Sequence, residues 1–122
     1  MSEFQKLVES DMLGSRPLWW TPSATDLTYQ MKPGDQIMII GLHTVADDSV
    51  ILTLPAKAQA AGKFYYICVP DVDNPGTTGD VSVYDKEAGT EIATYGDLDA
   101  DDDHIMFYCD GRLWRAFYNG VA

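Results

Sequence analysis

Short apolar runs separated by turn-forming residues dominate the chain from Arg16 onward. Runs of this length, rich in β-branched and aromatic residues, are typical of β-strands. We predict strands over Leu18–Trp20, Leu27–Met31, Gln36–Ile40, Ser49–Leu54, Lys63–Val69, Val81–Val83, around Ile92, His104–Cys109 and Arg112–Tyr118. Regularly spaced short strands with little helix between them predict an all-β fold, a small antiparallel β-sandwich or barrel with a short N-terminal helix or arm.

The run Lys63–Val69 is apolar at successive positions, so both of its faces are suited to burial. We therefore expect a central strand there. Pro33 and Gly34 occupy the two middle positions of a predicted type II turn, because proline fixes φ and glycine accepts a positive φ. Asp110–Gly111 between two apolar runs predicts a type I′ hairpin. Ala56–Ala61 has helical propensity and predicts one helical turn or a loop.

The first thirteen residues carry an apolar stripe at helical spacing. Its members are Phe4, Leu7, Val8 and Met12. We predict a short helix that ends at Gly14, within an N-terminal arm of residues 1–20 that precedes a β domain of residues 21–122. Because so short a helix is marginal in water, the stripe should dock either on its own domain or on a neighbouring subunit. Both possibilities stay open.

Composition indicates more about the kind of partner than about the fold. The chain has 122 residues, which suits one domain, and a formal net charge of −11. That charge makes nucleic acid an improbable partner, because phosphate binding depends on clustered Lys and Arg. The sequence has neither an apolar run of about 18 residues nor a signal-peptide pattern, so we expect neither a membrane span nor standard secretion.

Two cysteines, Cys68 and Cys109, lie in apolar runs, and we expect buried, reduced thiols, with a bridge between them as the alternative.

Alternating carboxylates at Asp97, Asp99 and Asp101 resemble the opening of a calcium loop and form a weak calcium candidate. The EF-hand pattern fails, because Asp102 stands at the sixth position, where glycine is needed, and Tyr108 at the twelfth, where glutamate is needed. A solvated acidic turn between strands is the preferred interpretation. We expect no metal and no cofactor.

The sequence contains no recognisable catalytic centre. His43 and His104 each lack a second ligand at metal-binding spacing. Asp103 precedes His104 directly, so on a strand the two side chains point to opposite faces and cannot readily share a proton. The glycine-rich phosphate loop, the dinucleotide fingerprint and the serine elbow are absent too. We therefore predict that the protein is not an enzyme, and a small hydrolase is the weakest of the functions considered.

Adjacent tryptophans give the clearest candidate contact surface. If Leu18–Trp20 is extended, Trp19 and Trp20 point to opposite sides, so at least one of them can leave the core and meet a partner. The predicted interface with a partner or a neighbouring subunit consists of Phe4, Leu7, Val8, Leu18, Trp19 and Trp20.

The run from Val50 to Trp114 resembles a segment of tailed-bacteriophage virion proteins. Val50–Pro55 forms a strand ending in Thr-Leu-Pro and is followed by an Ala-Gly-Lys turn and an aromatic strand, Phe64–Ile67. The similarity continues through Gly79–Val83 and Gly89–Ile92 to Asp110–Trp114. The order and spacing of these elements carry the resemblance, which covers about half of the chain.

The resemblance is to capsid decoration (cement) and head-fibre proteins, which are often homotrimers with a β-sandwich or barrel. It implies a protein made in the host cytoplasm that binds the major capsid protein on the outer surface of the mature head and stabilises it. The alternative is a receptor- or glycan-binding module of a phage fibre or tail tip, which would use the aromatic residues and the acidic loop.

Overall fold

The computed structural model describes residues 16–23, 25–41, 50–69, 81–92, 98 and 103–119. Its elements in chain order are β1 (Leu18–Trp20), β2 (Thr28–Gln30), β3 (Ile37–Ile40), β4 (Val50–Thr53), α2 (Lys57–Ala60), β5 (Phe64–Val69), β6 (Val81–Asp85), β7 (Thr90–Glu91), β8 (Asp103–Cys109) and β9 (Trp114–Asn119). The described fold is therefore mostly β with one short helix, as the sequence predicts.

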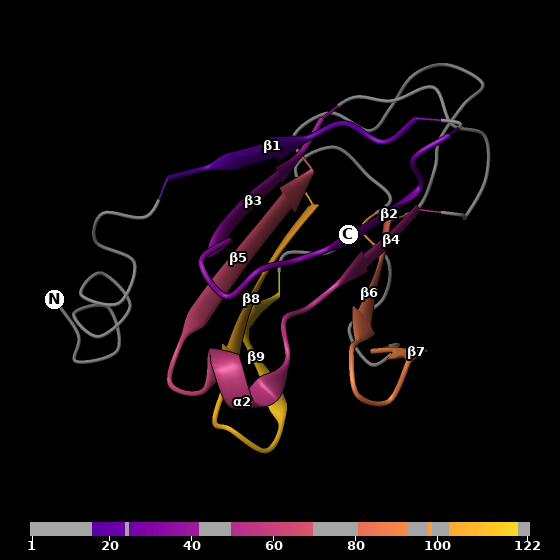
Figure 1. The fold of residues 1–122 in the computed structure, drawn as a ribbon. Coiled ribbons are helices and arrows are strands. Elements are labelled where there is room, and N and C mark those ends of the chain that lie inside the picture. Colours follow the sequence, from indigo (N-terminus) through magenta and orange to yellow (C-terminus); the bar gives the residue numbers. More distant parts are fainter. Residues whose placement is uncertain are drawn as a thin grey trace, which may run out of the picture.

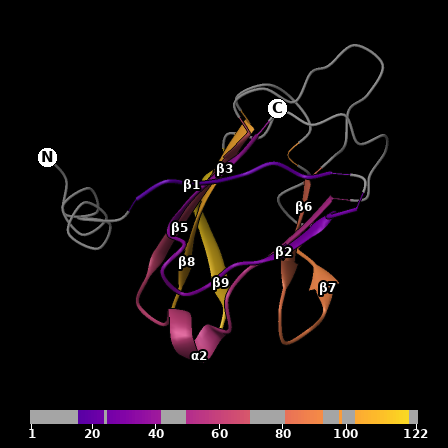
Figure 2. The same ribbon diagram turned by 45° about the horizontal axis from the view of Figure 1, so that its top comes forward.

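The strands form two sheets (Figure 1). One sheet has five strands in the order β1-β3-β5-β8-β9, and the other has four in the order β2-β4-β6-β7. The central position predicted for Lys63–Val69 is confirmed, because β5 is the third of five strands. Residues of both sheets belong to one hydrophobic core cluster. The second view shows the strands of the two sheets as two separate groups (Figure 2).

The predicted antiparallel character is wrong, because both sheets are mixed. β1, β3 and β5 run parallel to one another, and so do β2, β4 and β6. The chain passes from one sheet to the other at each step from β1 to β6, so successive strands of the same sheet run in the same direction. The antiparallel strand pairs are β5 with β8, β8 with β9, and β6 with β7.

Burial alternates along the strands because successive side chains point to opposite faces. In β8, for example, Asp103, Ile105, Phe107 and Cys109 are buried and the residues between them are half-buried. Both sheets contribute to the core: Met38, Ile67 and Phe107 come from the five-stranded sheet, and other members come from the four-stranded one. The latter members are Val50, Leu52, Val81 and Val83.

The two predicted turns form with a different geometry. The Asp35 amide donates to the Lys32 carbonyl at 2.9 Å, which closes a turn around Pro33 and Gly34. Gly34 has no positive φ, so the turn is not type II. In the hairpin between β8 and β9, the Asp110 amide donates to the Leu113 carbonyl at 3.2 Å. The middle positions of this turn are therefore residues 111 and 112, and not 110 and 111.

Gly111 has φ of 92° at the first middle position, the place where a type II′ turn takes glycine. The predicted helical turn at Ala56–Ala61 is confirmed by α2. The predicted helix within residues 1–13 and the acidic turn at Asp97–Asp103 lie outside the described residues, apart from Leu98 and Asp103. No helix in the described part of the chain is long and apolar enough to cross a membrane.

Candidate interaction surface

Strand β1 presents one tryptophan to solvent and holds the other in the core. Trp20 is buried and its ring centroid lies 5.6 Å from that of Tyr29 on β2, across the core. Leu18 is partly buried and packs against the same core. Trp19 points to the opposite face of the sheet and is 63% exposed. Of the three predicted interface residues on β1, Trp19 is therefore the one whose side chain a partner can cover.

β1 is also an edge strand, and among the described strands its single neighbour is β3. The Gly41 amide donates to the Trp20 carbonyl at 2.8 Å, and Trp20 pairs with Ile40. In a parallel pair, the amide and the carbonyl of one residue point toward the same neighbouring strand, and the next residue points the other way. The backbone amide and carbonyl of Trp19 therefore point away from β3, toward the open edge.

Two prolines limit the length of this edge. Pro17 precedes β1 and has no amide hydrogen, and Pro22 follows β1 closely. Proline next to an edge strand restricts strand addition to a short stretch of backbone. The strand itself has no charged residue. The edge is thus short, apolar and centred on Trp19.

Among the residues that the structure describes, Leu113 is the other large apolar side chain that is exposed, at 56%. It lies in the turn between β8 and β9, where the Asp110 carboxylate accepts hydrogen bonds from the amides of Arg112 and Leu113, both at 2.8 Å. These amides, with the Arg115 side chain, lower the pKa of Asp110 to about 2. Leu113 could not be singled out from the sequence, because an apolar residue beside Trp114 looks like part of the strand.

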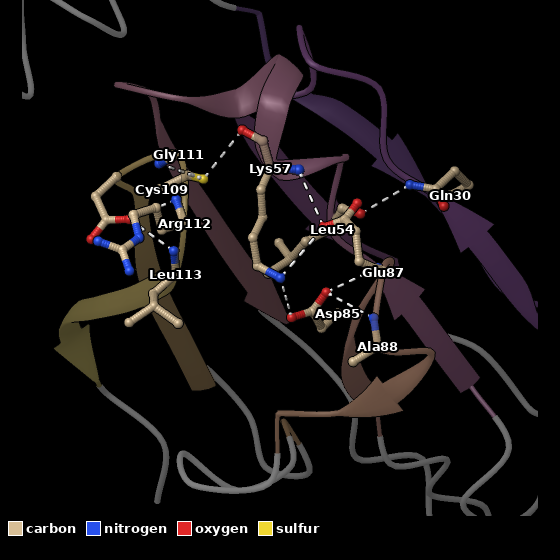
Figure 3. Close-up of polar contacts among 11 residues, drawn as sticks. Gln30, Leu54, Lys57, Asp85, Glu87, Ala88, Cys109, Gly111, Arg112 and Leu113 are labelled. Carbon is tan, nitrogen blue, oxygen red and sulfur yellow. Dashed lines mark hydrogen bonds and ion pairs between the residues drawn. The ribbon is translucent and has the colours of Figure 1, made fainter.

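Close to this turn, α2 is tied to the turn between β6 and β7 (Figure 3). The Lys57 ammonium donates to Asp85 at 2.7 Å and lies 3.4 Å from Glu87. The hydrogen bond to Asp85 raises the pKa of Lys57 despite the opposing effect of burial. Burial alone would raise the pKa of Asp85, but its hydrogen bonds from Lys57 and from the amides of residues 87 and 88 lower it. The Lys57 cluster, which consists of Lys57, Asp85 and Glu87, therefore holds α2 against the turn between β6 and β7.

Cys109 lies beside the same cluster. Its thiol contacts the Lys57 carbonyl at 3.6 Å and accepts from the Gly111 amide at 3.4 Å, and burial raises its pKa. Both cysteines are free thiols, Cys109 buried and Cys68 half-buried on β5, so the predicted burial is confirmed for Cys109 but not for Cys68. Because a raised pKa lowers the thiolate fraction, Cys109 has the properties of a packing residue and not of a nucleophile.

His104 and Asp103 point to opposite faces of β8, as expected from their adjacency. Asp103 is 1% exposed on the core side, whereas the His104 ring lies 6.0 Å from the ring of Tyr66 on the outer face. The structure thus does not bring the two together. No group of three metal-ligating side chains is found within the described residues.

Phe4, Leu7 and Val8 of the proposed interface lie outside the described residues, and so do the calcium candidates Asp97, Asp99 and Asp101. Comparisons with protein-family models, with curated proteins and with solved structures find no match for this chain.

Proposed function

We propose that this chain is a bacteriophage capsid decoration protein, which binds the outer surface of the mature head and stabilises it. The observation that carries the proposal is Trp19, an exposed indole on an open, uncharged edge strand. Trp is among the residues that contribute most to affinity at protein contact sites. In this proposal the partner is the major capsid protein and the site of action is the virion surface.

The segments that resemble phage virion proteins coincide with structural elements. Val50–Pro55 contains β4, Phe64–Ile67 lies in β5, and Gly89–Ile92 contains β7. Asp110–Trp114 forms the hairpin turn that leads into β9. This agreement supports a shared structural module, and we further propose that the two sheets form a β-sandwich and that the protein occupies the capsid as a homotrimer.

The proposed mechanism is mechanical and needs no catalytic residue. Copies bind at symmetry-related positions of the expanded capsid and bury apolar surface there. A partner that binds only one state of a lattice stabilises that state by mass action. The N-terminal arm, residues 1–20, faces the capsid, so that β1 and Trp19 continue the contact made by the apolar stripe of residues 2–14.

Deletion of Ser2–Gly14 tests the role of the arm. The truncated chain and the full chain are mixed with purified DNA-filled heads of the phage that encodes the protein, and occupancy is measured by co-sedimentation. We expect a loss of occupancy of at least tenfold. Undiminished occupancy by the truncated chain would refute the capsid-facing arm. Thermal unfolding of both chains serves as the control for folding.

A receptor- or glycan-binding module of a fibre or tail tip is the second candidate, because an exposed indole also suits the apolar face of a sugar ring. The two functions differ in what Trp19 contacts. Binding to a glycan array that is lost in Trp19→Ser, together with no binding to heads, would replace the decoration proposal with this one. A rise in melting temperature on addition of calcium would favour the same outcome.

A further inference from the structure

The open edge of β1 is complementary to a second copy of itself. We propose that two copies of the chain associate through antiparallel pairing of their β1 strands, with the two-fold axis passing beside Trp19. This inference goes beyond the decoration proposal and does not depend on it, because it follows from the backbone geometry of residues 17–21 and from the side chains of the edge strands.

The first step is the direction of the backbone groups. Since Trp20 directs its carbonyl to Gly41 of the neighbouring strand, the outward-pointing residues are Trp19 and its alternate neighbours, Pro17 and Thr21. Antiparallel pairing about Trp19 places it opposite the second copy's Trp19, and places Pro17 opposite the second copy's Thr21. The Trp19 pair exchanges two hydrogen bonds, and each Thr21 amide donates to a Pro17 carbonyl.

The second step is the fit of the side chains. Both Trp19 indoles lie on the same face of the joined sheet as direct cross-strand neighbours, the arrangement in which aromatic pairs stabilise antiparallel strands. In the dimer of free chains, the indole of the second copy covers the 63% of Trp19 that is exposed in one copy. This dimer therefore has to dissociate before Trp19 contacts a capsid. A two-fold contact of this kind is closed, so it produces a dimer and not a fibre.

The third step is the choice among the edges. The four edge strands are β1, β9, β2 and β7. β9 carries Arg115 and β7 carries Glu91, charged residues that oppose strand addition at an edge. β2 has no charge, but its large apolar residue, Tyr29, is packed against the core. β1 alone among these edges combines an uncharged strand with an exposed large apolar side chain.

The size of the contact makes the dimer weak. A tryptophan buries about 150–250 Å², so two of them with three-residue strands stay below the area of about 1,200 Å² that a stable complex needs. The formal charge of −11 on each copy adds repulsion that salt screens. We expect the dimer fraction to rise both with protein concentration and with ionic strength.

A cysteine placed at the axis tests the pairing directly. Hydrogen-bonded antiparallel partners have Cα atoms about 5.5 Å apart, which lies within the range that a disulfide spans. Full-length Trp19→Cys should therefore form a disulfide-linked dimer under mild oxidation, detected by non-reducing electrophoresis. Leu113→Cys, an equally exposed position away from β1, is the matched control, and the wild type reports any background from Cys68 and Cys109.

Preferential cross-linking of Trp19→Cys supports the proposal, and equal or absent cross-linking of the two variants overturns it. Trp19→Asp supplies a second measurement, because it places two carboxylates opposite each other at the axis. Sedimentation velocity at high protein concentration should show a dimer for the wild type and for Leu113→Asp but a monomer for Trp19→Asp. A trimer without cross-linking at position 19 would overturn the β1 pairing and leave the decoration proposal standing.

Discussion

The two ends of the sheets differ in the charge of their connecting residues. At one end, which we call the α2 end, the chain turns through residues 31–36, 54–63, 86–89 and 110–113, all of which are described (Figure 1). At the other end, which we call the acidic end, residues 42–49, 70–80 and 93–102 connect described strands. β3 and β5 end there, and β8 begins opposite Val69.

The connections at the two ends differ in their formal charge. The described residues hold seven acidic and seven basic side chains, whereas the whole chain holds 19 and 8. The entire formal charge of −11 therefore belongs to residues outside the described ranges. The three connections of the acidic end contribute nine aspartates and no lysine or arginine: Asp47, Asp48, Asp71, Asp73, Asp80, Asp97, Asp99, Asp101 and Asp102.

At the α2 end, the carboxylates are engaged by nearby groups. Asp85 and Glu87 contact Lys57, Asp110 contacts Arg115, and Asp35 accepts from the Tyr29 hydroxyl. This hydrogen bond adds to the effect of burial and raises the pKa of Tyr29 to about 12. The comparison indicates that nearby groups engage the carboxylates of the α2 end, whereas the connections of the acidic end contain nine aspartates and no lysine or arginine in their sequence. The following substitutions test that difference.

Lys57→Met should have the largest effect. Lys57 and Asp85 are each 19% exposed, so removing the ammonium leaves a largely buried carboxylate without its cation. We expect the free energy of unfolding to fall by about 2 kcal/mol, measured by urea denaturation. Lys86→Met is the control, because Lys86 is exposed and has no ion-pair partner among the described residues. An equal loss in both variants would contradict the role of the cluster.

Gly111→Ala should destabilise the α2 end by about 1 kcal/mol, because a side chain disfavours positive φ. The new Cβ would also lie 3.4 Å from the Cβ of Ala61. Gly34→Ala is the matched control, since Gly34 has no positive φ and no atom within 4 Å of the added Cβ. Melting temperatures should fall for Gly111→Ala and stay unchanged or rise for Gly34→Ala. The reverse order would refute the turn geometry.

At the acidic end, removing negative charge should raise the stability, whereas the substitutions at the α2 end lower it. Asp99→Asn, Asp101→Asn and Asp102→Asn combined should raise the melting temperature slightly at low salt, because like charges repel. Sodium chloride should stabilise the wild type more than this triple variant. A triple variant that is less stable at every salt concentration would contradict the repulsion, and would instead indicate that these carboxylates bind a cation.

The smallest expected effect is the loss, at low pH, of the contribution that Asp110 makes to stability. Because its folded pKa is lowered from 3.8 to about 2, its contribution to stability is present above about pH 4 and is lost as the pH falls through 2. Asp110→Asn keeps the turn acceptor but removes this dependence. The difference in melting temperature between the two proteins should therefore shrink from pH 6 to pH 2. A constant difference would show that the charge of Asp110 has no role.

The positions of the strands could be predicted from the sequence, but their directions could not. Periodicity marks where Lys63–Val69 and His104–Cys109 become strands, because burial acts on each residue locally. Whether neighbours run parallel depends on the connections, and those cross between the sheets. The predicted type II turn is wrong, because Gly34 does not adopt the positive φ that this turn type needs.

The candidate surface was predictable in part. Adjacency of Trp19 and Trp20 requires one of them to leave the core, but the choice depends on the packing of Trp20 against Tyr29, which no local pattern contains. The Lys57 cluster was missed, because Lys57 and Asp85 are 28 positions apart in the sequence. Local sequence patterns contain no signal for such a long-range ion pair.

The central claim is that Trp19 on the open edge of β1 is the contact residue. Binding of Trp19→Ser and Leu113→Ser to DNA-filled heads, compared by co-sedimentation with the wild type, tests it most directly, since both residues are exposed and apolar. We predict at least a tenfold loss of affinity for Trp19→Ser and wild-type affinity for Leu113→Ser. Wild-type affinity for Trp19→Ser would contradict the account.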